Sequence, residues 1–295
     1  ALRAAGAEGG MTGWGWAATA GAFLAAHFLV GALARLAPRT PGQGRALALA
    51  TPLVFGLTLL FLWEAVVVGA GVSPVLLPPP SAIVTRFAAS GATLWADFQQ
   101  TFLKAVLAGY ALGCGAAVLA GIGVSRSDFL KRGVLPVGSF LAALPIVGTA
   151  PIMVMWFGFD WPSKAAVVVL MCFFPMLVNA VAGLESPDAM QRDLMRTYAA
   201  TPGQTLMKLR LPAAAPFLFN GMKICSTLAL VGAIVAEFFG TPTVGMGFRI
   251  STEVGRMNLD MVWAEITVAA LAGSAFYGLI VLVERRVTFW HPSRH

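Results

Sequence analysis

Long apolar runs, separated by short polar stretches, make up most of this chain. Each run approaches or exceeds the roughly 20 residues that an α-helix needs to cross a bilayer. In chain order the runs cover residues 14–36, 46–70, 98–124, 133–157, 164–184, 213–239 and 261–283. The pattern predicts seven membrane-spanning helices, with only the tight turn at residues 158–163 between the fourth and the fifth.

The fourth run carries helix-disrupting residues near its middle, namely Pro136, Pro145, Gly148 and Pro151. A proline in a spanning helix removes a backbone hydrogen bond that neighbours or water must replace. Broken helices at this depth often border the substrate path of transporters. Two interpretations of the break are therefore open: it borders a translocation pathway, or it is a simple packing kink. For the methionine and aromatic residues the alternative to the pathway is ordinary packing. The residues assigned to the pathway are Pro145, Gly148, Thr149, Met153, Phe173, Phe174, Asn179 and Glu237.

The composition agrees with a membrane protein. Of the 295 residues, 58% are hydrophobic and only 11% are charged, whereas about a quarter of a typical soluble domain is charged. We therefore expect an all-α polytopic membrane protein. Cys114, Cys172 and Cys225 lie inside predicted helices without a C-x-x-C spacing, which favours packing roles over a disulfide framework or a metal site.

The net charge of +7 becomes informative through its distribution along the chain. Most lysines and arginines fall on alternate polar stretches, at residues 35–45, 126–132, 192–210 and 285–294. Cytoplasmic loops carry such an excess, so these stretches and the C-terminus are predicted to be cytoplasmic, with the N-terminal tail (residues 1–13) outside. An uncleaved signal is the alternative for the first run, but its length and weakly basic flank favour a spanning helix.

A proline-rich stretch, residues 73–81, follows the second run. Its prolines forbid a continuing helix, and Ser81 is positioned to cap a new one. The apolar residues that follow predict a short interfacial helix; they are Ile83, Val84, Phe87, Leu94 and Trp95.

Among the ionisable residues inside the predicted spans, we single out Glu64, Lys104, Glu237 and Glu265. Placing such groups in lipid is costly unless they are paired or hydrated. All four fall in the outer halves of their helices, so we expect Glu64, Lys104 and Glu265 to reach towards the outer interface. Glu237 adjoins a Phe-Phe-Gly break and is expected either to line an outer gate or to brace it through a hydrogen bond.

The loop between the fifth and sixth runs carries the most informative motif. It reads Asp-Leu-Met-Arg-Thr-Tyr-Ala from Asp193, then nine residues, then Leu-Arg-Leu-Pro ending at Pro212. This spacing resembles the cytoplasmic coupling motif of binding-protein-dependent ABC importers, which has Glu-Ala-Ala, three residues, Gly, nine residues and Ile-x-Leu-Pro. Asp193 takes the Glu position and Ala199 the Gly position, and only Leu211 with Pro212 is identical.

The resemblance implies that this loop, residues 185–212, docks on a separate ATPase. Pro202 and Gly203 interrupt its helical pattern and predict two short helices joined at an angle, while Pro212 is expected to begin the next membrane helix. The positive-inside bias is an alternative reason for its arginines, but it does not explain the motif spacing. The residues assigned to coupling are Asp193, Arg196, Thr197, Tyr198, Ala199, Pro202, Gly203, Leu206, Leu211 and Pro212.

Further segments resemble one subfamily of these permeases, which serves alkanesulfonates, taurine, nitrate, pyrimidine precursors and riboflavin. They are residues 77–81, 144–151, 155–164, 173–184 and 236–247. The resemblance covers roughly residues 46–286 and implies a type I ABC importer permease core of about six transmembrane helices. Residues 14–36 then form an additional N-terminal transmembrane helix, and residues 287–295 a cytoplasmic tail.

The same resemblance implies the partners and the location of the chain. It implies a homodimer in the bacterial inner membrane, two ABC ATPase subunits and an extracytoplasmic substrate-binding protein. We expect contact with membrane lipid and none with nucleic acid.

The chain lacks the residues that would let it use ATP itself. A phosphate-binding P-loop ends in Gly-Lys-Ser/Thr, and no lysine here follows a glycine. His27, His291 and His295 are scattered, and no G-x-S-x-G element or carboxylate pair marks a catalytic centre. We therefore expect a transport subunit that is not an enzyme and binds no cofactor or metal, with ATP and Mg²⁺ used by the partner ATPase.

The expected charge of the pore bears on the cargo. We expect no arginine or lysine at the midplane of the pore, which favours a neutral ring compound of pyrimidine or flavin type over a sulfonate, taurine or nitrate. The competing class is a secondary transporter or channel acting alone. That class predicts an inverted repeat or a buried ion-coupling acid at the midplane, and the sequence shows neither.

Overall fold

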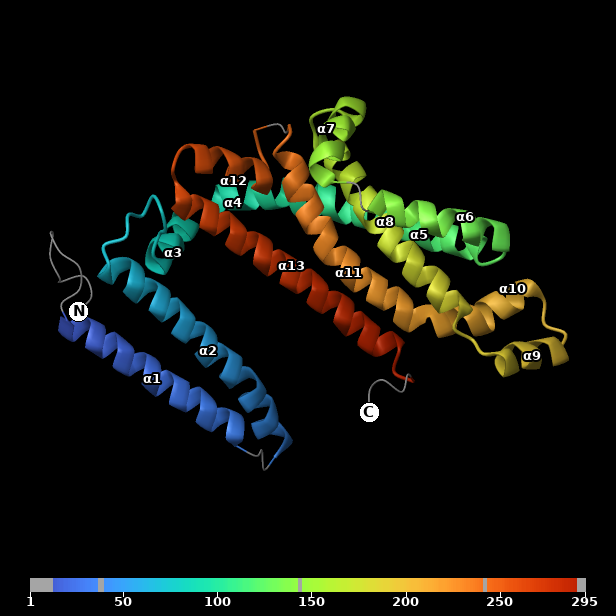
Figure 1. Ribbon diagram of the computed structural model, residues 1–295, viewed down its shortest axis with the longest axis horizontal. Coiled ribbons are helices and arrows are strands. Elements are labelled where there is room, and N and C mark those ends of the chain that lie inside the picture. Colours follow the sequence, from blue (N-terminus) through green and yellow to red (C-terminus); the bar gives the residue numbers. More distant parts are fainter. Residues whose placement is uncertain (1–12, 37–39, 143–144, 241–242, 291–295) are drawn as a thin grey trace. The chain divides into compact units, whose positions relative to one another are not determined.

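The computed structural model describes residues 13–36, 40–142, 145–240 and 243–290, which are helical throughout apart from turns and short connections (Figure 1). The helices are α1 (Gly13–Arg35), α2 (Pro41–Gly69), α3 (Pro80–Ala89), α4 (Gly91–Phe98), η2 (Gln99–Val106), α5 (Leu107–Val124), α6 (Asp128–Ala142), α7 (Ile146–Phe157), α8 (Trp161–Glu185), α9 (Ala189–Thr197), α10 (Pro202–Thr205), η3 (Leu206–Arg210), α11 (Leu211–Glu237), α12 (Met246–Gly255) and α13 (Leu259–Val287). Here η2 and η3 are π-helical segments within longer helical runs.

Within the described residues, six helical stretches are long and apolar enough to cross a membrane. They are Gly15–Leu33, Gly42–Gly69, Gly91–Val124, Trp161–Glu185, Pro202–Glu237 and Leu259–Val287. The fourth apolar run of the sequence is not one continuous helix. It is divided between α6, which ends at Ala142, and α7, which has Pro145 as its N-cap, and each is too short to span alone.

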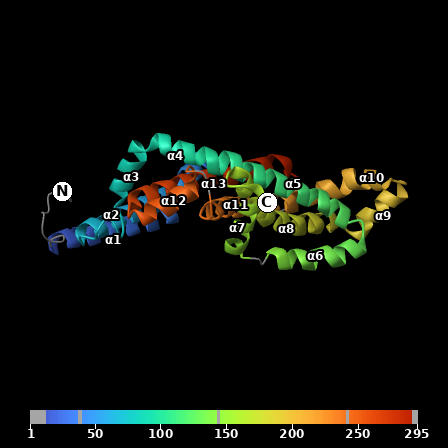
Figure 2. The same ribbon diagram turned by 90° about the horizontal axis from the view of Figure 1, so that it is seen from above.

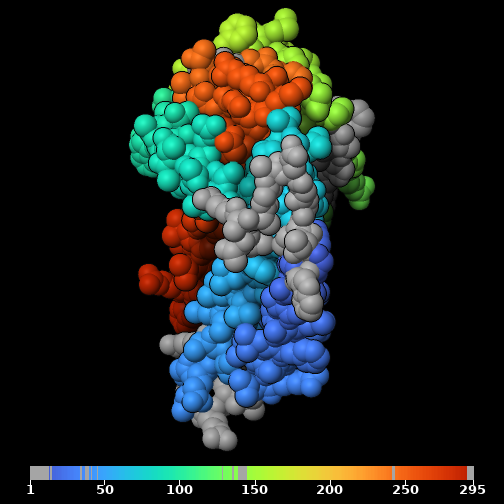
Figure 3. All heavy atoms as spheres, turned by 90° about the vertical axis from the view of Figure 1, so that its left-hand side faces the viewer, coloured from blue at the N-terminus to red at the C-terminus, as the bar shows by residue number. Residues whose placement is uncertain are grey.

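The chain forms two compact units. Unit 1 comprises Ala1–Gly91 with Glu253–Ala264, and unit 2 comprises Ala92–Thr252 with Glu265–His295. In unit 1, α1 and α2 pack side by side as a hairpin (Figures 1 and 3). Thr40 caps α2, its hydroxyl accepting a hydrogen bond from the Gln43 amide at 3.3 Å.

The start of α3 corrects the expectation for Ser81. The N-cap of α3 is Pro79, and the Ser81 hydroxyl donates to Glu64 Oε1 at 2.8 Å while its amide donates to Glu64 Oε2 at 3.0 Å. A carboxylate from α2 therefore caps α3, which satisfies one of the amides that a helix leaves unpaired at its start and suits the positive end of the helix dipole.

The core of unit 2 consists of α5, α8 and α11, which approach closely at glycines. Any Cβ at Gly109 would lie 2.6 Å from Val168 Cβ, and one at Gly121 would lie 2.9 Å from Ala180 Cβ. Residue numbers rise together along these contacts, so α5 and α8 are parallel. Small residues of this kind let membrane helices pack backbone against backbone. Along α8 and α11 the numbers run in opposite directions, from Gly183 beside Ala214 to Gly232 beside Met171, so this pair is antiparallel.

The parallel arrangement of α5 and α8 requires the chain between them to return to the other end of the unit. The α6 helix begins that return, since Lys131 pairs with Glu185 at the end of α8, and Gly138 lies against Phe174 further back along it. In Figure 2, α8 lies between α5 and α6. The α7 helix packs at the start of α8, where Ala150 meets Val167, so α6 and α7 together return the chain along α8.

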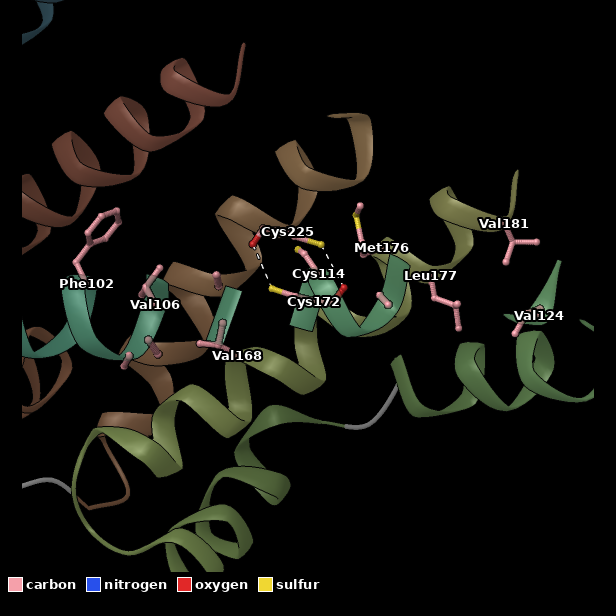
Figure 4. Packing of buried hydrophobic residues seen from close by; sticks show 14 residues of the cluster. Phe102, Val106, Cys114, Val124, Val168, Cys172, Met176, Leu177, Val181 and Cys225 are labelled. Atoms are coloured by element: carbon pink, nitrogen blue, oxygen red, sulfur yellow. Dashed lines mark hydrogen bonds between the residues drawn. The ribbon is translucent and has the colours of Figure 1, made fainter. Parts of the chain in front are cut away.

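The three cysteines come from three different helices and meet in this core (Figure 4). Cys172 Sγ donates to the Cys225 carbonyl at 3.5 Å, and Cys225 Sγ donates to the Cys172 carbonyl at 3.3 Å. All three thiols are free and buried. They act as small packing residues where α5, α8 and α11 approach one another.

Candidate functional site

The loop that carries the motif forms two helices joined by a tight turn at one end of unit 2 (Figures 1 and 2). Its first helix, α9, starts with a capping box. Asp188 Oδ1 accepts from the Gln191 amide at 2.7 Å, and Gln191 Oε1 accepts from the Asp188 amide at 3.1 Å. This reciprocal pair satisfies amides that a short exposed helix would otherwise leave to water.

The end of α9 explains why the motif has a glycine. Ala199 has φ +47°, its amide donates to the Arg196 carbonyl at 2.8 Å, and the Ala200 amide donates to the Met195 carbonyl at 3.0 Å. These bonds define a Schellman turn, whose left-handed position favours glycine because a Cβ there meets the following carbonyl. The chain adopts this geometry with alanine in place of glycine.

The second helix confirms the predicted angled pair and corrects its details. Thr201 and Gln204 form a second capping box, and Pro202 occupies the first turn of α10. The break between the helices therefore lies before Pro202, at residues 198–201. Pro212 lies in the first turn of α11, as predicted. The chain is already helical before it, from Pro202 through η3.

One face of the elbow, by which we mean α9, the turn and α10, is apolar and exposed. Met190, Leu194 and Tyr198 have exposed fractions of 80%, 55% and 77%, and their spacing of four places them on one side of α9. Asp193 and Arg196 form an exposed ion pair at 3.2 Å, and such surface pairs contribute little to stability. The exposed apolar face is typical of a docking surface.

The remaining coupling residues hold the elbow together or lie at its base. The Thr197 hydroxyl donates to the Asp193 carbonyl at 3.0 Å. Gly203 is exposed, and a Cβ added there would meet no atom within 4 Å. Leu206 and Leu211 are half-buried where the elbow joins α11.

The pathway residues of α7 are accessible at its start and packed towards its end. Pro145 is the N-cap of α7, and Gly148 has open space where a side chain would be. The Thr149 hydroxyl donates to the Ile146 carbonyl at 3.2 Å. Met153 packs against the buried cluster of Ala150, Val167 and Ala236.

The aromatic pair and Asn179 lie on α8. The rings of Phe173 and Phe174 meet edge to face with centroids 5.0 Å apart, and both pack on the core. Asn179 Nδ2 donates to the Pro175 carbonyl at 2.8 Å, and Asn179 Oδ1 accepts from Asn220 Nδ2 of α11 at 3.1 Å. Asn220 is exposed, so the two asparagines form a polar link on the surface of two membrane helices.

Glu237 lies in a sealed polar network, which favours bracing over lining a gate. The side chain is 2% exposed. Its carboxylate accepts from the Thr101 hydroxyl at 2.8 Å and from the Gly247 amide at 2.7 Å, and the Thr101 hydroxyl accepts from the Met246 amide at 2.8 Å. The network thereby ties η2 and α11 to the start of α12.

The other members of this network were not among the residues predicted from the sequence. Asp97 is 0% exposed and accepts from the Gly245 amide at 2.6 Å and from Arg249 Nε at 2.9 Å. The available signal was the spacing of four between Asp97 and Thr101, which places two polar side chains on one face of an apolar helix.

Of the residues expected to reach the outer interface, Lys104 is exposed, and its Nζ donates to Gln100 at 2.9 Å. For Glu265 the expectation is wrong, since this residue is 0% exposed. Both oxygens of its carboxylate are buried, so the side chain does not reach the surface.

The turn before α8 is held by two side chains. Asp160 accepts from the Trp161 amide at 2.7 Å and from Gln100 Nε2 at 2.6 Å. The Trp161 N–H holds the pKa of Asp160 below its usual range. Lys164 is buried and donates to the carbonyl groups of Phe159 and Gly240.

The expectation that the midplane lacks a basic residue is also wrong. Lys223 lies at the middle of α11, and its Nζ is 3.0 Å from Glu284 Oε2 of α13. A single lysine inside an apolar run does not disturb the hydrophobic pattern, which is why the run reads as uncharged. Here a partner carboxylate compensates its charge.

Comparison with known proteins agrees with this geometry. Residues 109–289 match the family described as "Binding-protein-dependent transport system inner membrane component". The formylaminopyrimidine transport permease protein ThiX of Halalkalibacterium halodurans is 32% identical over 247 residues, covering 82% of this chain and 96% of ThiX. The riboflavin transport system permease protein RibX of Chloroflexus aurantiacus is 31% identical over 248 residues (83% and 91%). The taurine transport system permease protein TauC of Escherichia coli is 29% identical over 244 residues (79% and 86%).

Proposed function

Because the chain belongs to the family of binding-protein-dependent transport system inner membrane components, we propose that it carries a small neutral ring compound into the cytoplasm as part of a homodimer. It is the permease subunit of an ABC importer, a multi-pass component of the inner membrane and not an ATPase. The family implies an ATPase and a binding protein as partners.

The observation that carries the coupling proposal is the exposed apolar face of the elbow. Met190, Leu194 and Tyr198 present this face on a rigid, doubly capped support. Burying it against an ATPase subunit would stabilise the complex by roughly 25 cal/mol per Å² of apolar area. The basic residues around it support a cytoplasmic position for the elbow.

This proposal is tested by purifying variants with the ATPase subunit and binding protein in lipid. Tyr198→Ala should weaken co-purification of the ATPase by about 1 to 2 kcal/mol and lower both stimulated ATP hydrolysis and uptake. Phe129→Ala is the matched control, since Phe129 is an equally exposed aromatic residue on α6. An unchanged ATPase association in Tyr198→Ala, or equal loss in the control, would overturn the assignment of this face.

A backbone test addresses the elbow itself. Gly203→Pro constrains Pro202, which precedes it, away from the helical conformation that it adopts in α10. Gly203→Ala is the control, because its methyl group has open space. We expect loss of coupled hydrolysis and uptake in the proline variant alone. Uptake by the wild-type chain along an ion gradient without ATP would instead favour a secondary transporter.

Two observations support a neutral cargo. Relatives named for formylaminopyrimidine and riboflavin transport cover most of this chain, and the midplane lysine, Lys223, is compensated by Glu284. An anion would therefore have to compete with that carboxylate for the lysine. Sulfonates, taurine and nitrate remain the alternative cargoes, since a taurine transport permease is almost as similar.

The cargo is tested in proteoliposomes that contain the whole importer. Uptake of labelled formylaminopyrimidine, riboflavin and taurine is measured with ATP inside and the cognate binding protein outside. The proposal expects ATP-dependent uptake of a ring compound. Uptake of taurine alone would refute the neutral cargo while leaving the coupling proposal intact.

A further inference from the structure

A pocket of about 390 Å³ lies where the elbow meets the end of α5. Its lining residues are Ser125, Arg126, Ala200, Pro202, Thr205, Leu206 and Arg210. All belong to unit 2. The pocket is distinct from the exposed face of α9 that we assign to the ATPase, and none of the family motif's acidic positions lines it.

The charge of this pocket is positive and uncompensated. Among the residues that the structure describes, neither Arg126 nor Arg210 has a carboxylate partner. Three acids near the elbow whose side chains the structure describes are engaged elsewhere: Glu185 pairs with Lys131, Asp188 caps α9, and Asp193 pairs with Arg196. Two guanidinium groups therefore face one hollow with their donors available.

The hydroxyl groups of the pocket do not supply donors. Ser125 Oγ donates to the Ile122 carbonyl at 3.0 Å, and Thr205 Oγ1 donates to the Thr201 carbonyl at 3.1 Å. A ligand must therefore be an acceptor for the two arginines. The planar fork of arginine matches the oxygens of phosphate, to which it binds in a bidentate manner.

The position of the pocket indicates where such a phosphate comes from. Arg126 lies two residues beyond the apolar span that ends at Val124, and Arg210 directly precedes α11. The pocket thus lies at the level where spans end and phospholipid headgroups begin. Ala200, Pro202 and Leu206 add an apolar wall suited to the glycerol end of a lipid.

We propose that Arg126 and Arg210 bind the phosphate group of an anionic phospholipid. The bound headgroup joins the end of α5 to the base of the elbow, so it fixes the elbow against the membrane. The site rests on the pocket and its charges, and binding is measurable without transport or ATP.

The test uses the permease and ATPase complex, extracted from bilayers of phosphatidylcholine with or without phosphatidylglycerol. Native mass spectrometry measures the lipid that each complex retains. Arg126→Gln and Arg210→Gln should each lower phosphatidylglycerol retention about tenfold, the loss expected for a charge-assisted hydrogen bond. Arg132→Gln removes the same charge from the same side, outside the pocket, and should retain lipid like the wild type.

A second arm distinguishes the source of the phosphate. Inorganic phosphate is added to the delipidated complex, and the melting temperature is measured. A rise in the wild type that Arg126→Gln abolishes, without selective retention of phosphatidylglycerol, would assign the site to soluble phosphate. Equal lipid retention in all variants, with no effect of phosphate, would overturn the proposal. Loss of the ATPase subunit from both pocket variants, with lipid retention unchanged, would also overturn it and assign the arginines to the ATPase interface.

Discussion

The Thr101 hydroxyl lies 2.8 Å from Glu237 Oε1, and both side chains are buried. The same hydroxyl accepts the Met246 amide, so one small side chain joins three segments of unit 2. Thr101 lies in the π-helical segment η2, a local geometry often found at functional sites. The hydrogen bonds of Thr101 therefore hold the start of α12 against η2 and α11.

Removing this hydroxyl should destabilise the protein. Thr101→Val keeps the shape but leaves the Met246 amide and one hydrogen bond of Glu237 unmet, at a cost of about 1 to 3 kcal/mol. Thr101→Ser restores the hydroxyl and should recover most of the loss. Glu237→Gln should have an intermediate effect, because its amide oxygen still accepts one bond. Thermal unfolding in nanodiscs measures all three, and a valine variant as stable as the serine variant would contradict this role.

The left-handed turn at Ala199 predicts a stabilising substitution. Ala199→Gly should relieve about 1 kcal/mol of backbone strain and slow hydrogen exchange of the Ala199 and Ala200 amides. Ala200→Gly is the control, because Ala200 is not among the residues with positive φ and glycine there only adds freedom to the unfolded chain. Faster exchange in Ala199→Gly than in the wild type would show that the turn is not under strain.

The pair formed by Lys223 and Glu284 predicts rescue by a double substitution. Glu284→Leu alone leaves a charged lysine among membrane helices, and since the side chains keep 22% and 18% exposure, we expect a loss of roughly 1 to 3 kcal/mol, below that of a fully buried pair. Adding Lys223→Met should recover most of it. Thermal unfolding of Glu284→Leu, Lys223→Met and the double variant forms a double-mutant cycle. Additive losses of stability would mean that the two charges do not interact.

Gly148 allows the pathway to be tested without a packing artefact. A Cβ added there meets no atom within 4 Å, so Gly148→Leu should fold and assemble normally yet block uptake if α7 borders the route. Gly115→Leu, at an equally open position on α5, controls for added bulk in the membrane. Normal uptake by Gly148→Leu would favour the packing-kink interpretation.

The parallel arrangement of α5 and α8 makes a topology prediction. Ser127 and Ser186 follow the ends of these two helices, so cysteines placed there should be labelled only from the cytoplasm, and one at Ser251, beyond α11, only from outside. The buried Cys114, Cys172 and Cys225 are replaced by alanine beforehand. Labelling of Ser127 and Ser251 positions from the same side would contradict the orientation.

The features that the sequence predicted well depend on local patterns. Apolar run length revealed the spans, and the motif spacing revealed the elbow, because both are properties of contiguous residues. The prolines also signalled the irregular fourth run, although the division into α6 and α7 at Pro145 required the structure.

The features that the sequence did not predict depend on helix register. Asp97 and Arg249 meet only because α4 and α12 are brought together, and the three cysteines meet only through close packing of α5, α8 and α11. Ser81 had a plausible local role as a cap, but a carboxylate from α2 took the capping position. Such contacts are set by which faces pack, which spacing along one segment does not determine.

The parallel packing of α5 on α8 has a consequence for biogenesis. During synthesis α5 enters the membrane before α8. Its glycine-lined face, at Gly109 and Gly121, therefore contacts lipid until the residues between the two helices and then α8 have been inserted. The antiparallel α8 and α11 are joined by the elbow and emerge in succession, so they form the first hairpin of the core. The tightly packed core therefore forms late in synthesis, when α5 packs against the pair formed by α8 and α11.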